Sequence, residues 1–171
     1  MNEIFAADKA RYANGTILTD HAIRFLWILR KCQTSRNLLW RIIRRKMSVK
    51  YGLEIPNGKN IDAGLYLGHA FNITINPNAV IGKNVNIHKG ATIGQENRGK
   101  RKGAPSIGDS VWIGINSTIV GAVRIGNDVL IAPNAYVNCD VPDHSIVIGN
   151  PCTITPRNNA TEDYINRRVD E

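Results

Sequence analysis

A large aliphatic residue recurs every six positions through most of this chain. The interval is six at every step except two: it is eight between Leu67 and Ile75 and fourteen between Ile93 and Ile107. This period matches neither an α-helix, with about 3.6 residues per turn, nor the alternating faces of a strand. It predicts a solenoid in which each repeat buries its apolar face against its neighbours. The series comprises Ile55, Ile61, Leu67, Ile75, Ile81, Ile87, Ile93, Ile107, Ile113, Ile119, Ile125, Ile131 and Val137.

Two further regularities follow the same period. Four places after most of these residues comes a small apolar or hydroxyl residue, at Ala79, Val85, Ala91, Val111, Ser117, Val123, Val129, Ala135 and Val141. Three places after many of them comes Gly, Asn or Asp, at Gly58, Gly64, Asn78, Asn84, Gly90, Asn116, Asp128, Asn134 and Asp140. Because these three residue types best tolerate a positive φ, we expect a corner in every hexad. Three corners close a triangular coil of about eighteen residues, and roughly five coils fit.

The net charge of +8 comes entirely from residues 1–50, which hold eleven Lys or Arg and three acidic residues. Apolar residues in this segment recur at helical spacing from about Thr16 to Met47, and Thr19 or Asp20 is suited to cap the start. A second helix is expected from Leu38 to Met47. The chain therefore divides into a basic helical segment (1–50), a solenoid (51–157) interrupted by a loop (95–105), and a tail (158–171), for which we expect a short polar helix.

The basic helical segment has two interpretations. In the first, its apolar side chains cover unpaired strand edges at one end of the solenoid and its cations are solvated. In the second, cations beside Trp27, Trp40 and Ile43 form an amphipathic helix that attracts anionic lipid. A nucleic-acid site is not expected, because no nucleic-acid-binding motif accompanies the charge. The cations concerned are Arg41, Arg44, Arg45, Lys46 and Lys50.

Other features of the sequence favour a cytoplasmic protein, with contact at the inner face of the membrane as a further possibility. No stretch approaches the roughly 20 apolar residues that span a bilayer, and the charged N-terminus does not resemble a secretory signal. The three cysteines are odd in number and form no CxxC pair, which indicates reduced thiols.

Several hexads resemble those of the hexapeptide-repeat acyltransferases, among them Ile81–Asn86, Ile113–Thr118 and Ile125–Leu130. This resemblance implies a left-handed parallel β-helix, usually trimeric, with acetyl-CoA held between neighbouring subunits. The left hand rests on the resemblance alone, since ordinary parallel crossovers are right-handed. Residues 51–157 are most similar to the serine acetyltransferases, through Leu-Gly-His-Ala at 67–70, Gly-Ala-Thr-Ile-Gly at 90–94, Val-Pro-Asp-His-Ser at 141–145 and Gly-Asn-Pro at 149–151.

An O-acetyltransferase needs a base that takes a proton from a hydroxyl group as it attacks a thioester, and histidine suits this task at neutral pH. By resemblance, His69 matches the catalytic histidine of the serine acetyltransferases. Glu54, fifteen residues upstream, matches the acid that orients this histidine. Because fifteen residues is three fewer than a coil of eighteen, the two residues can lie near one another on adjacent coils. His88 is the alternative base. His21 and His144 are interpreted as structural.

The acceptor is judged from departures from the serine acetyltransferase pattern. That family typically has Asp before the catalytic histidine and an Arg-His pair before the loop proline, whereas this chain has Gly68, Gly103 and Ala104. Because these charged groups are missing, we expect a saccharide hydroxyl, as in the similar exopolysaccharide acetyltransferases of the colanic acid type. L-Serine is the alternative acceptor. The basic loop 95–105 would then contact CoA phosphates or an anionic acceptor, or be solvated.

For acetyl-CoA, the resemblance implies binding by backbone groups at the corners of successive coils, where side chains are small. The residues expected there are Gly94, Gly114, Ser117, Ala132 and Ala135, with Asn150 and Arg157 near the nucleotide. No metal is expected, because the pair of histidines five residues apart that a carbonic anhydrase of this fold would need is missing. A scaffold without catalytic activity, bound to a membrane at one end, is the non-enzymatic alternative.

Overall fold

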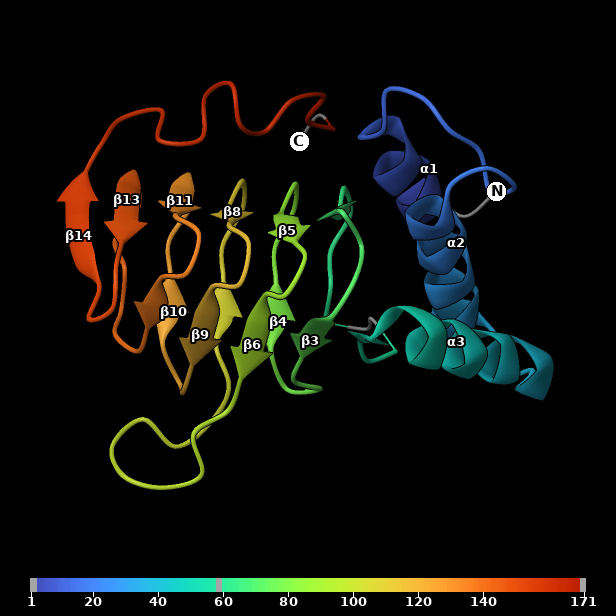
Figure 1. The fold of residues 1–171 in the computed structure, drawn as a ribbon, viewed down its shortest axis with the longest axis horizontal. Coiled ribbons are helices and arrows are strands. Elements are labelled where there is room, and N and C mark those ends of the chain that lie inside the picture. Colours follow the sequence, from blue (N-terminus) through green and yellow to red (C-terminus); the bar gives the residue numbers. More distant parts are fainter. Residues whose placement is uncertain (1–2, 58–59, 170–171) are drawn as a thin grey trace.

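The repeats fold into a three-sided parallel β-helix, described here by a computed structural model that covers residues 3–57 and 60–169 (Figure 1). One side is a five-stranded sheet of β1 (Leu53–Glu54), β3 (Ile73–Ile75), β6 (Thr92–Gly94), β9 (Thr118–Val120) and β12 (Tyr136–Val137). The second is a three-stranded sheet of β4 (Val80–Ile81), β7 (Ser106–Ile107) and β10 (Arg124–Ile125). The third is a six-stranded sheet of β2 (Tyr66–Gly68), β5 (Asn86–His88), β8 (Trp112–Ile113), β11 (Val129–Ile131), β13 (Ser145–Ile148) and β14 (Thr153–Pro156).

The recurring aliphatic residues form the core, as predicted. In the six-stranded sheet, Leu67 pairs with Ile87, Ile87 with Ile113, and Ile113 with Ile131, so identical positions of successive coils stack. All of these side chains are buried. Each coil thus buries its apolar residues on those of the next, which is how a solenoid obtains a continuous core.

Most of the predicted corner residues do adopt a positive φ, which confirms the corner hypothesis in outline. Among the predicted corner residues, those with this conformation are Gly64, Asn84, Gly90, Asn116, Asp128 and Asn134. Asn78 and Asp140 do not adopt it, and Gly58 lies outside the described residues.

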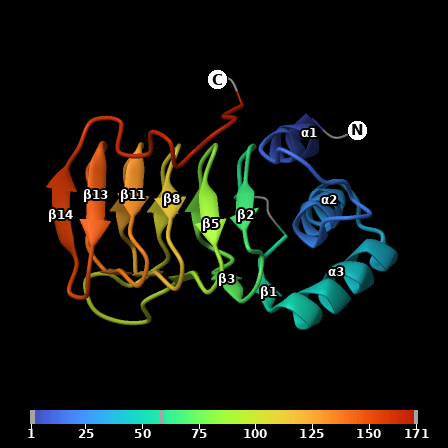
Figure 2. The same cartoon turned by 45° about the horizontal axis from the view of Figure 1, so that its top comes forward.

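In the described part of the chain, three helices cover the first coil, whereas two were expected in the N-terminal segment (Figures 1 and 2). They are α1 (Glu3–Ala10), α2 (His21–Thr34) and α3 (Leu38–Tyr51). The sequence pattern missed α1 and placed the start of α2 too early. Asp20 caps α2 by accepting hydrogen bonds from the backbone N–H groups of Ala22 and Ile23. Gly52 ends α3 in the left-handed conformation, with a φ of 67°.

A buried ion pair ties the helices to the β-helix. The Arg30 guanidinium donates from Nε to Asp8 Oδ2 at 2.7 Å and also to the carbonyl oxygens of Ile61 and Asp62, each at 2.7 Å. Asp8 in turn accepts from the Leu65 N–H at 2.9 Å. The helices therefore cap the solenoid, as the first interpretation predicts, and they do so through satisfied polar contacts as well as apolar ones.

The C-terminal segment is not the helix that we expected. Residues 157–169 run back along the six-stranded sheet as a series of turns, shown in red in Figure 1. Asn159, Asp163 and Arg167 have a positive φ, which interrupts any helix. Asp128 holds the segment by accepting from the Ala160 and Thr161 N–H groups, each at 3.0 Å.

Residues 3–57 and 60–169 were searched for membrane-spanning helices and for metal-binding clusters. Their helices are too short and too polar to span a bilayer. The same residues contain no cluster of three or more His, Cys, Asp or Glu side chains placed to hold a metal ion.

Candidate active site

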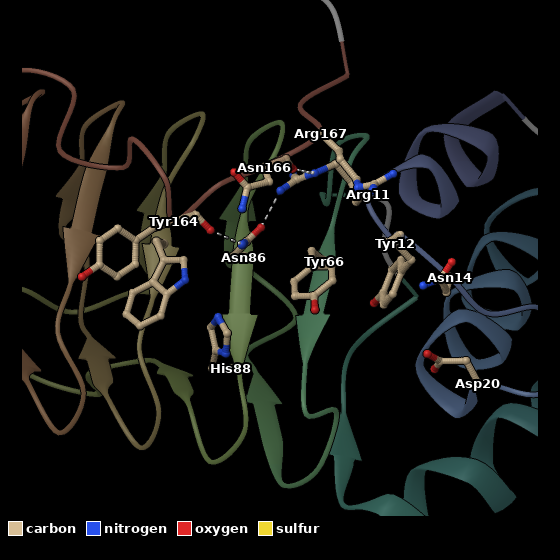
Figure 3. A pocket seen from close by; sticks show the side chains of 12 residues that line it. Arg11, Tyr12, Asn14, Asp20, Tyr66, Asn86, His88, Tyr164, Asn166 and Arg167 are labelled. Atoms are coloured by element: carbon tan, nitrogen blue, oxygen red, sulfur yellow. Dashed lines mark hydrogen bonds between the residues drawn. The ribbon is translucent and has the colours of Figure 1, made fainter.

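Two adjoining cavities form a groove on the outer face of β2, β5 and β8, which we call the outer groove; Figure 3 shows the larger of the two. Their volumes are about 490 and 300 Å³, and they share Tyr12, Asp20 and Tyr66. The segment between α1 and α2 forms one wall. The C-terminal segment forms another, through Tyr164, Asn166 and Arg167. Segments from the two ends of the chain thus meet over the sheet.

Arg11 holds these walls together. Its guanidinium donates to the Asn166 carbonyl at 3.0 Å, to the Gly64 carbonyl at 2.9 Å and to Asn86 Oδ1 at 2.7 Å. Burial lowers the pKa of Arg11 to about 10, so the side chain stays charged at neutral pH. Its hydrogen bonds go to the walls, which indicates a structural role at the rim of the groove.

His88 lies on β5 in the middle of the outer groove, between two aromatic rings. Its ring centroid is 4.7 Å from that of Trp112 and 6.4 Å from that of Tyr66. Desolvation, together with the charge of nearby His69, lowers the pKa of His88 to about 4. Its Nε2 is buried and has no hydrogen-bond partner among the described residues. The imidazole is therefore neutral at pH 7.

Gly68 makes room for this ring. The two residues pair across β2 and β5, and a Cβ at position 68 would lie 3.0 Å from His88 Cγ and closer still to Nδ1 and Cε1. An aspartate here, as in the serine acetyltransferase pattern, would therefore collide with His88 in its present position.

His69 follows β2 at a corner, where it is exposed and has a φ of 51°. It lines the smaller cavity with Tyr12, Asp20 and His21. Because Gly68 pairs with His88, His69 lies one residue beyond this pair, and the two histidines line adjoining cavities of the outer groove. The structure therefore brings the two alternative bases together.

Glu54 lies elsewhere. It is on β1 in the five-stranded sheet, paired with Thr74, and lines a separate cavity with Arg44 and Gly94. No hydrogen bond or ion pair joins Glu54 to His69 within the described part of this chain. The expected proximity of the two residues is thus not found in a single chain.

The other two histidines have structural surroundings, as interpreted from the sequence. His21 Nε2 lies 3.1 Å from the Ala70 carbonyl oxygen, and its ring stacks on that of Tyr51. His144 Nδ1 lies 2.8 Å from Asp128 Oδ2, which also holds the C-terminal segment.

The residues expected to contact acetyl-CoA lie in three different parts of the β-helix. Gly114 and Ala132 each come one residue after the paired Ile113 and Ile131, so they extend the row that begins with Gly68 and His88. Gly94 ends β6 in the five-stranded sheet, and the exposed Asn150 and Arg157 flank β14. Ser117 and Ala135 are fully buried, and Ser117 Oγ donates to the Gly114 carbonyl at 2.8 Å. These two side chains therefore contribute to the packing of the coil and are not exposed on the surface of a single chain.

Sequence reasoning missed the aromatic and charged walls of the groove. Tyr12, Asp20 and Tyr164 follow no motif, and they line one cavity with Trp112 of β8 only because the two terminal segments fold over the sheet. Of these residues, only Asp20 was singled out in the sequence, as a candidate N-cap of a helix.

Comparisons with known proteins agree with this architecture. Residues 104–139 match the family described as bacterial transferase hexapeptide (six repeats). The chain is 31% identical over 153 residues to the serine acetyltransferase of Staphylococcus epidermidis, covering 86% of this chain and 72% of that protein. It is 34% identical over 119 residues to serine acetyltransferase 4 of Arabidopsis thaliana, where the match covers 70% of this chain but only 34% of the longer relative.

A solved structure is also similar. Neisseria gonorrhoeae serine acetyltransferase, in complex with serine, superposes with a TM-score of 0.76 at 30% identity, covering 90% of this chain and 68% of the other. The relatives named here are serine acetyltransferases and not exopolysaccharide acetyltransferases. The comparisons thus support the serine acetyltransferase resemblance and not the exopolysaccharide acetyltransferase resemblance.

Proposed function

Because this chain belongs to the serine acetyltransferase family, whose fold is the left-handed parallel β-helix, we propose that it transfers an acetyl group from acetyl-CoA to a hydroxyl group. The observation that carries the proposal is the meeting of His69 and His88 in the outer groove, beside the row of small residues that includes Gly114 and Ala132.

The reaction requires one proton to move twice. A neutral imidazole removes the proton of the acceptor hydroxyl while its oxygen forms a bond to the acetyl carbonyl carbon of the thioester. When the carbon–sulfur bond breaks, the imidazolium returns that proton to the CoA sulfur. No covalent bond between enzyme and acetyl group is needed.

We assign the base to His69. A pKa of about 4 makes His88 a weak base at neutral pH, while the exposed His69 is free to approach an acceptor. His88 then acts by position, because its neutral ring lines the groove without repelling the imidazolium that forms on His69. The role predicted for Glu54 stays a prediction, and Glu54→Gln tests it in the assay below.

The acceptor that we propose is L-serine. The larger cavity of the outer groove is lined by one carboxylate, Asp20, and by the cationic Arg167, and these are the charges that an amino acid requires. They come from the terminal segments and not from positions 68, 103 and 104, where the family pattern has its charged residues.

A saccharide is the second candidate, supported by a different observation. The same cavity is lined by four Tyr or Trp side chains, Tyr12, Tyr66, Trp112 and Tyr164. Such rings combine an apolar face with a polar edge, which suits the ring of a sugar. The absence of charge at Gly68, Gly103 and Ala104 is consistent with an uncharged acceptor.

Release of the free CoA thiol from acetyl-CoA measures the proposed activity, with L-serine and a panel of sugars supplied separately. We expect release with L-serine above the rate without acceptor. Release with sugars alone would replace the acceptor, and no release with either would refute the acetyltransferase proposal. We propose a homotrimer, as the family resemblance implies, and sedimentation equilibrium of the same sample tests it.

A further inference from the structure

Helix α3 has an apolar surface on each of two opposite sides. On the inner side, Met47 is buried and the Trp40 ring lies edge-on to that of Trp27, with centroids 5.2 Å apart. On the outer side, Leu38 is 63% exposed, Leu39 54%, Ile42 44% and Val49 70%. The helix is thus fixed by one side and leaves the other side uncovered by this chain.

The outer residues follow a pattern. Successive residues of a helix are about 100° apart, so Leu38, Ile42 and Val49 fall within about 40° of one line along α3. Arg41 and Arg45 lie on one side of this line, and Lys46 and Lys50 lie on the other. We call these seven residues the α3 outer surface.

The charge of this surface is of one sign. The fourteen residues of α3 contain five Lys or Arg and no Asp or Glu. Both views of the fold place α3 at the end of the molecule opposite β14 (Figures 1 and 2). An apolar line between two rows of cations, presented at one end of a protein, has the distribution of an interfacial helix.

We propose that the α3 outer surface binds a membrane that contains anionic lipid. Leu38, Ile42 and Val49 would enter the boundary between headgroups and acyl chains, while the flanking cations contact lipid phosphates. The β-helix and its outer groove would then stand away from the membrane plane.

Charge argues against the other occupants of this surface. Two copies of the chain packed through it would bring the cations of one helix against those of the other. A nucleic acid would satisfy the cations but would leave the apolar line against a polar backbone. An anionic lipid surface satisfies both groups at once.

Flotation of the whole protein with lipid vesicles tests the proposal. The probes are phosphatidylcholine vesicles with and without phosphatidylglycerol. We expect binding to the anionic vesicles alone, weakened by salt. Each cation near such a surface contributes about fivefold in affinity, so Arg41→Gln/Arg45→Gln should bind about 25-fold more weakly. Leu38→Gln/Ile42→Gln/Val49→Gln should also lose binding.

Matched controls separate this surface from general stickiness. Lys100→Gln/Lys102→Gln removes the same charge from exposed positions of loop 95–105, and Val80→Gln/Ile148→Gln removes exposed apolar side chains from β4 and β13. Circular dichroism confirms that each variant folds. Equal losses in the controls, or equal binding to neutral vesicles, would overturn the proposal. It would also be overturned if the apolar variant abolished a vesicle-free dimer, or if the cation variant abolished binding to a DNA duplex while vesicles were not bound.

Discussion

Replacing Gly68 with Ala tests whether His88 occupies the place that the structure gives it. The new methyl group would lie 3.0 Å from His88 Cγ and nearer to two other ring atoms. Trp112 flanks the ring, with its centroid 4.7 Å away, so the imidazole has little room to shift within the sheet. We expect it to rotate toward the solvent of the outer groove.

Two effects set the size of the change. Overpacking of this kind costs about 1–3 kcal/mol. Because position 68 has no positive φ, the loss of glycine flexibility in the unfolded chain returns about 0.4–1 kcal/mol. The net loss in free energy of unfolding should therefore lie between about 0 and 2.6 kcal/mol. A hydrated ring also recovers its ordinary protonation, so the pKa of His88 should rise from about 4 toward about 6.5.

Urea unfolding measures the first effect, and NMR titration of the imidazole protons measures the second. Gly94→Ala is the matched control for stability. Gly94 also ends a three-residue strand without a positive φ, but there the nearest atom to a new Cβ is Val120 Cγ1 at 3.3 Å. The described packing of His88 over Gly68 is wrong if Gly68→Ala changes neither the pKa of His88 nor the free energy of unfolding relative to Gly94→Ala.

Three further perturbations test other parts of the structure. The pKa of His88 is lower in the folded chain than in the unfolded chain, so the stability that the residue contributes is complete above about pH 6.5 and is lost as pH falls toward 4. Because the ring is partly exposed, we expect the free energy of unfolding to change by about 1–2 kcal/mol over this range. Urea unfolding of His88→Gln should show a smaller change with pH. Arg30→Met leaves the Asp8 carboxylate buried and unpaired and should cost about 3–5 kcal/mol in thermal or urea unfolding, whereas Asp8→Leu/Arg30→Met should recover much of the loss. Asp128→Gly keeps a residue suited to its φ of 51° but removes the acceptor for Ala160 and Thr161, so amide hydrogen exchange should quicken in residues 157–169 and not in β5; equal protection in the variant would contradict the anchoring role of Asp128.

The β-helix could be predicted because its signal is local and repeated. Each hexad repeats the same pattern of buried residues, and a corner residue such as Asn84 or Asn116 lies within the same few residues. The walls of the outer groove could not be predicted in this way. Tyr12 and Tyr164 line one cavity although their segments are far apart in the sequence, and the C-terminal segment has no repeated pattern.

Counting residues also misplaced Glu54. The prediction assumed a coil of eighteen residues, but Leu53 pairs with Ile73, twenty positions later, because this coil includes the two-residue insertion. Glu54 therefore aligns with Thr74, five residues beyond His69. Which positions are buried follows from the period, whereas alignment between coils depends on where the insertions are absorbed.

The role of His69 is tested most directly by comparing two equivalent substitutions in the thiol-release assay. His69→Asn and His144→Asn each place an amide at an exposed histidine with a positive φ, of 51° and 55°, so backbone strain is matched. Loss of the general base predicts that kcat of His69→Asn falls by about 10²–10⁴-fold, while His144→Asn keeps the activity of the unmodified chain. Full activity in His69→Asn would contradict the assignment of His69 as the base.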